Sequence, residues 1–144
     1  MQTIDEVQQE IIEEFSLYDD WMDKYALIIE QGNALPPLDE KYKTPENIIE
    51  GCQSRVWLQT EFREGRLLFQ AESDAIIVKG LLALVLRVFN DRTPDEIIGN
   101  DLRFMKEIGL TDHLSPTRSN GLLSVIRQIR FYAIAYKTKA EKAE

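Results

Sequence analysis

The only cysteine of this 144-residue chain, Cys52, stands in the stretch EGCQSRVW at residues 50–57. A thiolate is both a nucleophile and a metal ligand, so this residue offers the clearest chemistry in the sequence. Gly51 precedes it, and the polar residues Gln53 and Ser54 follow it, which is unlike the surroundings of a core residue. The stretch also joins a loop to an expected strand, a position where functional residues are often held.

Two interpretations of Cys52 follow from the residues alone. Most free cysteines are small buried hydrophobes, and Cys52 can be one of them. The alternative is a reactive thiol. Arg55, three residues further on, would favour the thiolate if the loop folded its guanidinium group back towards the sulfur. Both interpretations stay open at this point.

Counting the possible partners of the thiol removes several classes of site. A structural zinc site needs about four Cys or His ligands, and an iron–sulfur cluster needs several thiolates. The chain has one Cys and one His. A C-x-x-C redox motif is excluded because position 55 is Arg, and a cysteine phosphatase would need an arginine where Leu58 stands. A hydrolase with a Cys52–His113 dyad, in which His113 is the base, remains an alternative.

Two further polar residues stand near expected helix starts. Asp74 is expected to cap a helix N-terminus, with a polar contact near the thiol or with a partner as the alternative. Arg118 lies in LSPTRSNG, where another helix begins. It is either a solvated arginine or a contact to an anion or partner, because a helix N-terminus presents free N–H groups.

The composition indicates one globular domain over residues 1–144, with 44% hydrophobic residues and a net charge of −8. Residues 1–50 hold 13 acidic and 3 basic residues. An acidic chain repels the phosphate backbone, so we expect no nucleic-acid partner. No apolar run is long enough for a membrane span. The acidic first residues do not resemble a signal or transit peptide, and a lone thiol suits a reducing compartment, so we expect a cytoplasmic protein.

The N-terminal half is expected to contain two helices and a hairpin. Thr3 and Glu6 form a T-x-x-E capping box that predicts the first helix, and a second helix is expected over residues 20–31. A proline-rich loop follows at 33–47. Alternating residues predict strands at 55–62 and 66–72, joined by a tight turn at Glu64-Gly65. A third strand is expected at 48–49 or in a stretch near the loop.

The C-terminal half is expected to be helical. An apolar helix at 75–90 should lie at the centre of the core. Short helices should follow at 93–99, where Thr93 and Glu96 form a second T-x-x-E capping box, and at 101–107. A last helix should run to residue 137, with 138–144 as a frayed tail. The fold class is therefore α+β, with a small antiparallel sheet of about three strands packed against several helices.

Three motifs resemble those of the SufE family, which includes CsdE and the Fe-S metabolism associated domain. They are GCQSRVWL at 51–58, SDAIIVKGL at 73–81 and LSPTRSNGL at 114–122. The resemblance extends over residues 4–138 and implies a SufE/IscU-like fold.

The resemblance also implies a role. Cys52 would take persulfide sulfur from a pyridoxal-phosphate cysteine desulfurase of the SufS or CsdA kind and stimulate that enzyme. The sulfur would pass to a scaffold of the SufBCD kind for iron–sulfur cluster assembly. The chain would need no cofactor or metal of its own and would not be a stand-alone enzyme. Supporting or partner-contacting residues implied by the resemblance are Gly51, Gln53, Ser54, Arg55, Asp74 and Arg118.

Elementary sulfur chemistry is compatible with this role. Exchange between thiols needs one thiolate on each partner, so one cysteine is sufficient. A bound persulfide is easily oxidised. A loop that shelters the cysteine at rest and extends it towards a partner would protect it, and we expect residues 47–54 to have that mobility.

Overall fold

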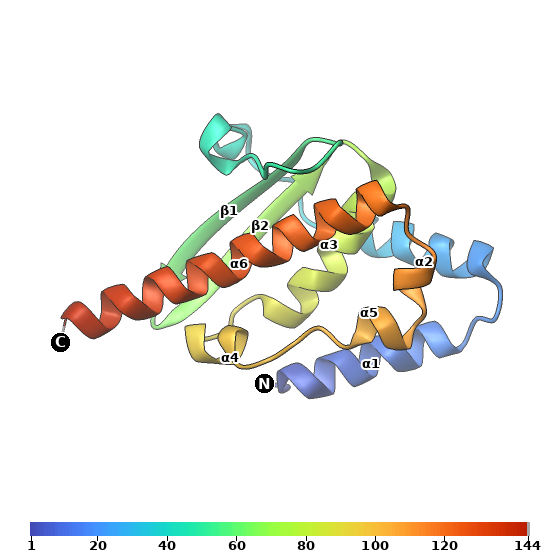
Figure 1. Cartoon of the computed structure of the whole chain (residues 1–144), viewed down its shortest axis with the longest axis horizontal. Helices are drawn as coiled ribbons and strands as arrows, with labels where there is room; N and C mark the ends of the chain where they lie inside the picture. The colour runs from blue at the N-terminus through green and yellow to red at the C-terminus, as the bar shows by residue number, and fades with distance from the viewer. Residues whose placement is uncertain (144) are drawn as a thin grey trace.

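The computed structural model describes residues 1–143, which fold into helices around one β-hairpin (Figure 1). The expected α+β class is confirmed. Six α-helices and two strands occur in this part of the chain: α1 Ile4–Ser16, α2 Trp21–Asn33, β1 Val56–Arg63, β2 Arg66–Ser73, α3 Ile76–Phe89, α4 Pro94–Ile98, α5 Phe104–Glu107 and α6 Pro116–Ala143. Three single 3-10 turns are η1 Glu40–Tyr42, η2 Pro45–Asn47 and η3 Leu110–Asp112.

Strands β1 and β2 pair in antiparallel fashion from Val56 opposite Ser73 to Arg63 opposite Arg66. Glu64 and Gly65 both have positive φ, 53° and 79°, as a two-residue type I′ turn requires. The prediction of a third strand is wrong. Ile48 forms only an isolated bridge with Trp57, because the turn η2 ends at Asn47 and the chain turns again at Glu50.

Helix α3 is the centre of the core, as its apolar sequence predicts. Nine of its 14 residues are buried. Helix α2 crosses it closely at Gly32 and Gly80, where a Cβ on Gly32 would lie 2.7 Å from the Gly80 nitrogen. Helix α6 passes in front of the hairpin in Figure 1. Phe62 of β1 stacks on Tyr136 of α6 with ring centroids 4.8 Å apart.

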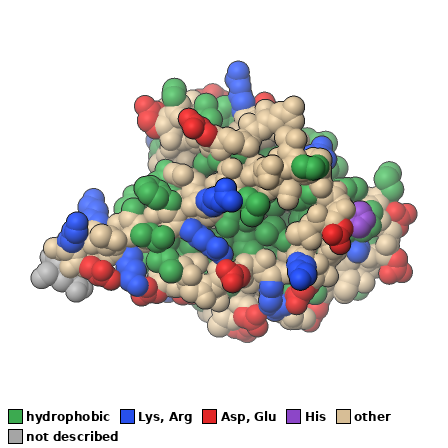
Figure 2. All heavy atoms as spheres, in the orientation of Figure 1, with side chains coloured by type: hydrophobic (Ala, Val, Ile, Leu, Met, Phe, Trp, Pro, Cys, Tyr) green, Lys and Arg blue, Asp and Glu red, His purple; other side chains and the backbone are tan. Residues whose placement is uncertain are grey.

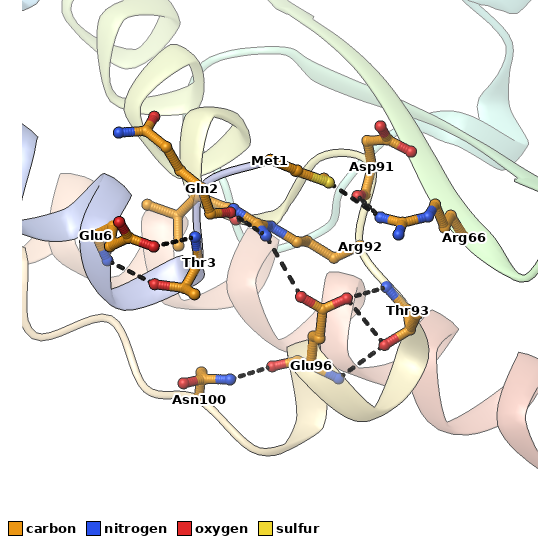
Figure 3. Close-up of polar contacts among 11 residues, drawn as sticks. Met1, Gln2, Thr3, Glu6, Arg66, Asp91, Arg92, Thr93, Glu96 and Asn100 are labelled. Atoms are coloured by element: carbon orange, nitrogen blue, oxygen red, sulfur yellow. Dashed lines mark hydrogen bonds and ion pairs between the residues drawn. The ribbon is translucent and has the colours of Figure 1, made fainter.

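Arg92 connects the start of the chain to the segment between α3 and α4 (Figure 3). Its side chain is buried, and it donates hydrogen bonds to the carbonyl oxygens of Val88 and Gln2 at 3.2 and 2.7 Å. Glu96 Oε2 lies 3.4 Å from the same guanidinium group. A buried cation needs such partners, so this cluster fixes the first residues against the core.

Both predicted capping boxes, Thr3 with Glu6 and Thr93 with Glu96, are present.

Two expected helix ends differ from the structure. Helix α5 begins at Phe104 rather than at 101, and Gln8 Oε1 accepts a hydrogen bond from the Phe104 N–H. Helix α6 continues through Ala143, so the predicted end at 137 is wrong; residue 144 lies outside the described residues. The continuation is rich in Ala, Lys and Glu, which favour helix, and Lys137 pairs with Asp95 at 2.7 Å.

The close crossing of α2 and α3 generates a stability prediction. A methyl group on Gly80 would overlap the Ile28 carbonyl oxygen, which belongs to backbone and cannot rotate away. Gly80→Ala should therefore lower the free energy of unfolding by about 2–3 kcal/mol in urea titrations, despite the better helix propensity of alanine. Lys79→Ala, on the same turn, is the matched control and should change it by less than about 1 kcal/mol. Equal stabilities would contradict the close crossing.

Candidate functional site

Cys52 lies in a short loop whose base is held by backbone hydrogen bonds. The Ile49 N–H donates to the Val56 carbonyl oxygen at 2.9 Å, which closes the segment on the edge of β1. Gly51 has φ of +91°, a conformation that glycine adopts without steric cost. The loop therefore turns sharply just before the cysteine, close to the start of α3 and the first turns of α6 (Figure 1).

Asp74 fixes the other side of this loop. Its Oδ1 accepts a hydrogen bond from the Arg55 N–H at 3.1 Å, and its own N–H donates to the Arg55 carbonyl oxygen at 3.3 Å. The prediction that Asp74 caps α3 is wrong. The N-cap position is Ala75, whose N–H donates to Ser73 Oγ, and the Asp74 carboxylate is used to hold the loop instead.

The Cys52 side chain is partly buried against the core. Its Sγ donates to the Gly121 carbonyl oxygen of α6 at 3.5 Å, within the range of a weak thiol hydrogen bond. Burial is the cause that raises the pKa of the Cys52 thiol above its ordinary value. At neutral pH the resting thiol is therefore protonated.

The sulfur opens into a pocket of about 380 Å³ between the loop, the start of α3 and the start of α6. This volume greatly exceeds the share of one water molecule, roughly 30 Å³, so a second sulfur atom has room beside the first. Gln53 and Ser54 line it from the loop, and Arg118 lines it from α6. The remaining lining residues are Ala75, Val78, Leu81, Leu82, Ser115, Thr117, Gly121, Leu122 and Val125.

Arg118 and Ser115 bring the polar start of α6 to this pocket. The Arg118 N–H donates to Ser115 Oγ at 3.2 Å, so Ser115 caps the first turn, and the Arg118 side chain is exposed at the pocket. The helix N-terminus carries a partial positive charge. The expectation that Arg118 stands at a helix start is confirmed, and the pocket combines an apolar wall with a positive side.

Arg55 does not have the position expected of a group that stabilises the thiolate. Its side chain is exposed, whereas its backbone forms the hydrogen bonds with Asp74. The pKa of Cys52 is raised rather than lowered, because burial acts on the thiol. The loop therefore presents the Arg55 backbone inwards and leaves the guanidinium group in solvent.

His113 is held apart from the thiol by contacts of its own. Its ring stacks on Trp21 with centroids 3.8 Å apart, and its Nδ1 lies 3.0 Å from the Gly109 carbonyl oxygen. Tyr25 donates its hydroxyl to the His113 carbonyl oxygen. Among the residues that the structure describes, His113 is not part of the pocket lining. The structure therefore gives the Cys52–His113 dyad no geometric support.

The surface near the pocket is mixed in character. Figure 2 shows Lys and Arg side chains along α6 and hydrophobic side chains exposed beside it. Ile76, at the start of α3, is 63% exposed, and Leu123 of α6 is 42% exposed. Within residues 1–143, no helix is both long and apolar enough to cross a membrane, and no group of three or more His, Cys, Asp and Glu side chains could hold a metal ion.

Sequence reasoning missed the part of α6 that receives the loop. Gly121 and Ser124 contact Cys52 and Gly51, yet neither stood out as a site residue. A glycine inside a helix costs about 1 kcal/mol relative to alanine, and this cost was the available signal of a close approach.

A family model described as "SufE: Fe-S metabolism associated domain" matches residues 9–133 of the chain. The chain belongs to the SufE family. This membership associates it with iron–sulfur metabolism and agrees with the resemblance of its three motifs.

A solved structure has a similar fold. The solution structure of a hypothetical protein from Thermus thermophilus superposes with a TM-score of 0.75 at 16% sequence identity. The match covers 92% of this chain and 96% of that chain. At this level of identity the likeness shows the fold alone.

Burial of the SufE-family thiol generates a pH prediction. Alkylation by iodoacetamide requires the thiolate, so its rate against pH should rise with a midpoint above that of an ordinary cysteine. The urea-unfolded chain should give the ordinary midpoint. The unfolded chain loses its thiol proton at a lower pH than the folded protein does. The contribution of Cys52 to the free energy of unfolding is therefore complete below the ordinary pKa, and it is lost as the pH rises from there through the raised pKa. Identical midpoints in the folded and unfolded chain would contradict the burial.

The Asp74 contact generates a second prediction. Asp74→Ala removes the acceptor of the Arg55 N–H and should accelerate hydrogen exchange of that amide by about tenfold, since a hydrogen bond to a charged group contributes roughly 1.5 kcal/mol or more. Asp74→Asn keeps an acceptor oxygen and should exchange at a rate closer to the parent protein. If both variants exchange like the parent protein, the carboxylate does not hold the loop.

Proposed function

We propose that this SufE-family protein is a sulfur acceptor and carrier, in which Cys52 takes the terminal sulfur of a persulfide on a cysteine desulfurase. The observation that carries the proposal is the single thiol of a short loop, beside a pocket with room for one more sulfur atom. Membership of a family associated with iron–sulfur metabolism supports it.

The transfer step balances without an added oxidant. The Cys52 thiolate attacks the outer sulfur of the partner's persulfide, and a new sulfur–sulfur bond forms on Cys52. The partner's sulfur–sulfur bond breaks, and its electron pair stays on the partner's cysteine, which leaves as a thiolate. Cys52 now carries the persulfide. The same exchange with a later acceptor returns Cys52 to its thiolate.

The residues around Cys52 can assist this step in distinct ways. The base of the loop, where Ile49 is hydrogen-bonded to Val56, holds Cys52 near the edge of β1. The apolar wall of the pocket excludes water from a bound persulfide. Arg118 and the positive start of α6 favour the negative charge that a persulfide carries when it ionises.

The partner is a pyridoxal-phosphate cysteine desulfurase of the SufS or CsdA kind, which this protein stimulates, and the cofactor belongs to that enzyme. Exposed Ile76 and Leu123 give the partner an apolar contact beside the pocket. The downstream acceptor is a scaffold of the SufBCD kind, and the reaction takes place in the cytoplasm.

Intact-protein mass spectrometry tests the proposal directly. After incubation with a SufS-type desulfurase and free cysteine, without reductant, the chain should gain the mass of one sulfur atom on Cys52. A reductant should remove it. Cys52→Ser should fold normally, gain nothing and fail to stimulate the desulfurase, because its hydroxyl cannot carry a persulfide.

His113→Ala is the control variant and should gain sulfur like the parent protein, since its ring contacts Trp21 and Gly109. Normal stimulation by Cys52→Ser would contradict the acceptor role. If the parent protein gains no sulfur from an active SufS-type enzyme or from a second enzyme of the CsdA kind, the proposal is wrong.

A further inference from the structure

Helix α6 carries large apolar side chains on two faces. One face is buried in the core, and it consists of Leu122, Val125, Ile126, Ile129 and Ala133. On the other face, Phe131 is 60% exposed and Ile134 is 54% exposed. A surface helix needs only one apolar stripe to pack on its own core. The exposed pair therefore does nothing for the packing of α6 and is free to contact another molecule.

Arg127 belongs to the same exposed face as this pair. It stands four positions before Phe131 and seven before Ile134, and such spacings place side chains on one side of a helix. We call Arg127, Phe131 and Ile134 the distal α6 face. Figure 2 shows hydrophobic side chains over this half of α6, with Lys and Arg side chains beside them.

The guanidinium group of Arg127 is not used inside the molecule. Two other cations of α6 are paired: Arg130 lies 3.1 Å from Asp101 and Lys137 lies 2.7 Å from Asp95. Within residues 1–143, Arg127 is exposed and forms no ion pair. An arginine among apolar side chains can bind a carboxylate in bidentate fashion. The distal α6 face therefore matches an apolar surface that carries an acidic residue.

The distal α6 face lies well away from the thiol. Gly121 is the residue of α6 that contacts Cys52. Phe131 follows it by ten residues, which is about 15 Å along a helix axis, and Ile134 lies further still. A molecule bound to the distal α6 face can therefore leave the Cys52 pocket open.

The charges favour a protein segment over the other possible occupants. A second copy packed symmetrically would bring the two Arg127 side chains together, and like charges repel. The chain has a net charge of −8, which opposes its approach to an anionic membrane. In contrast, aromatic side chains and arginine are the groups that contribute most to protein–protein binding.

We infer that the distal α6 face is a docking site for an acidic amphipathic helix of a partner protein, which binds while the Cys52 pocket stays open. Apolar residues of that helix cover Phe131 and Ile134, and a carboxylate meets Arg127. The inference goes beyond the proposed function and does not rest on it.

A synthetic helical peptide of about four turns tests the apolar contact, with Leu along one face and Glu beside it. Fluorescence anisotropy of the dye-labelled peptide should show saturable binding to the parent protein. Phe131→Ala should weaken the binding at least about tenfold, as expected for a central aromatic contact. Leu17→Ala removes a side chain that is 79% exposed at the end of α1, and it is the matched control that should bind like the parent protein. Circular dichroism should show both variants folded, because both side chains are exposed.

Reversing one charge tests the role of Arg127. Arg127→Glu should weaken binding of the acidic peptide and favour a peptide of the same design with Lys in place of Glu. Lys106→Ala removes an exposed cation from α5 and should leave both affinities unchanged. A parent protein that binds neither peptide, or binds both equally, would overturn the inference.

Alkylation of Cys52 decides whether the peptide binds apart from the thiol. The rate with iodoacetamide should be the same with and without saturating acidic peptide. A peptide that protects Cys52 would occupy the Cys52 pocket, and the inference would be wrong. It would also be wrong if Phe131→Ala abolished binding to phosphatidylglycerol vesicles, or self-association in sedimentation equilibrium, without changing the peptide affinity. The gain of sulfur from a desulfurase tests the proposed function separately, because none of these measurements uses that enzyme.

Discussion

Helix α3 must be surrounded on nearly every side, because nine of its 14 residues are buried. Helix α2 approaches it closely at Gly32 and Gly80, and β2, α1 and α6 pack on its remaining sides. Burial of apolar surface is the main favourable contribution to folding, so this helix organises the chain. Its first turns also form the wall of the Cys52 pocket. The site therefore takes its geometry from the core rather than from the loop alone.

The partly buried position of Cys52 works against its reactivity as a nucleophile. Nucleophilic attack needs a thiolate, whereas burial raises the pKa and keeps the proton on the sulfur. The positive start of α6 lies at the same pocket. A protonated, partly buried thiol reacts more slowly with oxidants than an exposed thiolate does. The proposed sulfur transfer would therefore be favoured by a movement of the loop that frees the thiol from this burial.

Local patterns in the sequence predicted the helices, the hairpin turn and both capping boxes, because each depends on residues close together in the chain. The family motifs also pointed to Cys52 and Arg118, and both residues line the same pocket. Contacts between segments that are distant in the sequence could not be predicted from local patterns. Asp74 was interpreted as a cap, since nothing in its neighbours indicates that it receives the Arg55 N–H. Similarly, the role of Gly121 appears only when α6 lies against residues 51 and 52.

The hydrogen bond between Ile49 and Val56 limits how far the cysteine loop can extend. Ile49 is hydrogen-bonded to Val56, and Cys52 is the third residue after the Ile49 anchor. Three residues of fully extended chain span at most about 10 Å. With this hydrogen bond intact, the Cα of Cys52 cannot lie further than this from the edge of β1, and only its short side chain reaches beyond. In the proposed transfer, a donor sulfur that lies outside this reach must move outwards to meet Cys52.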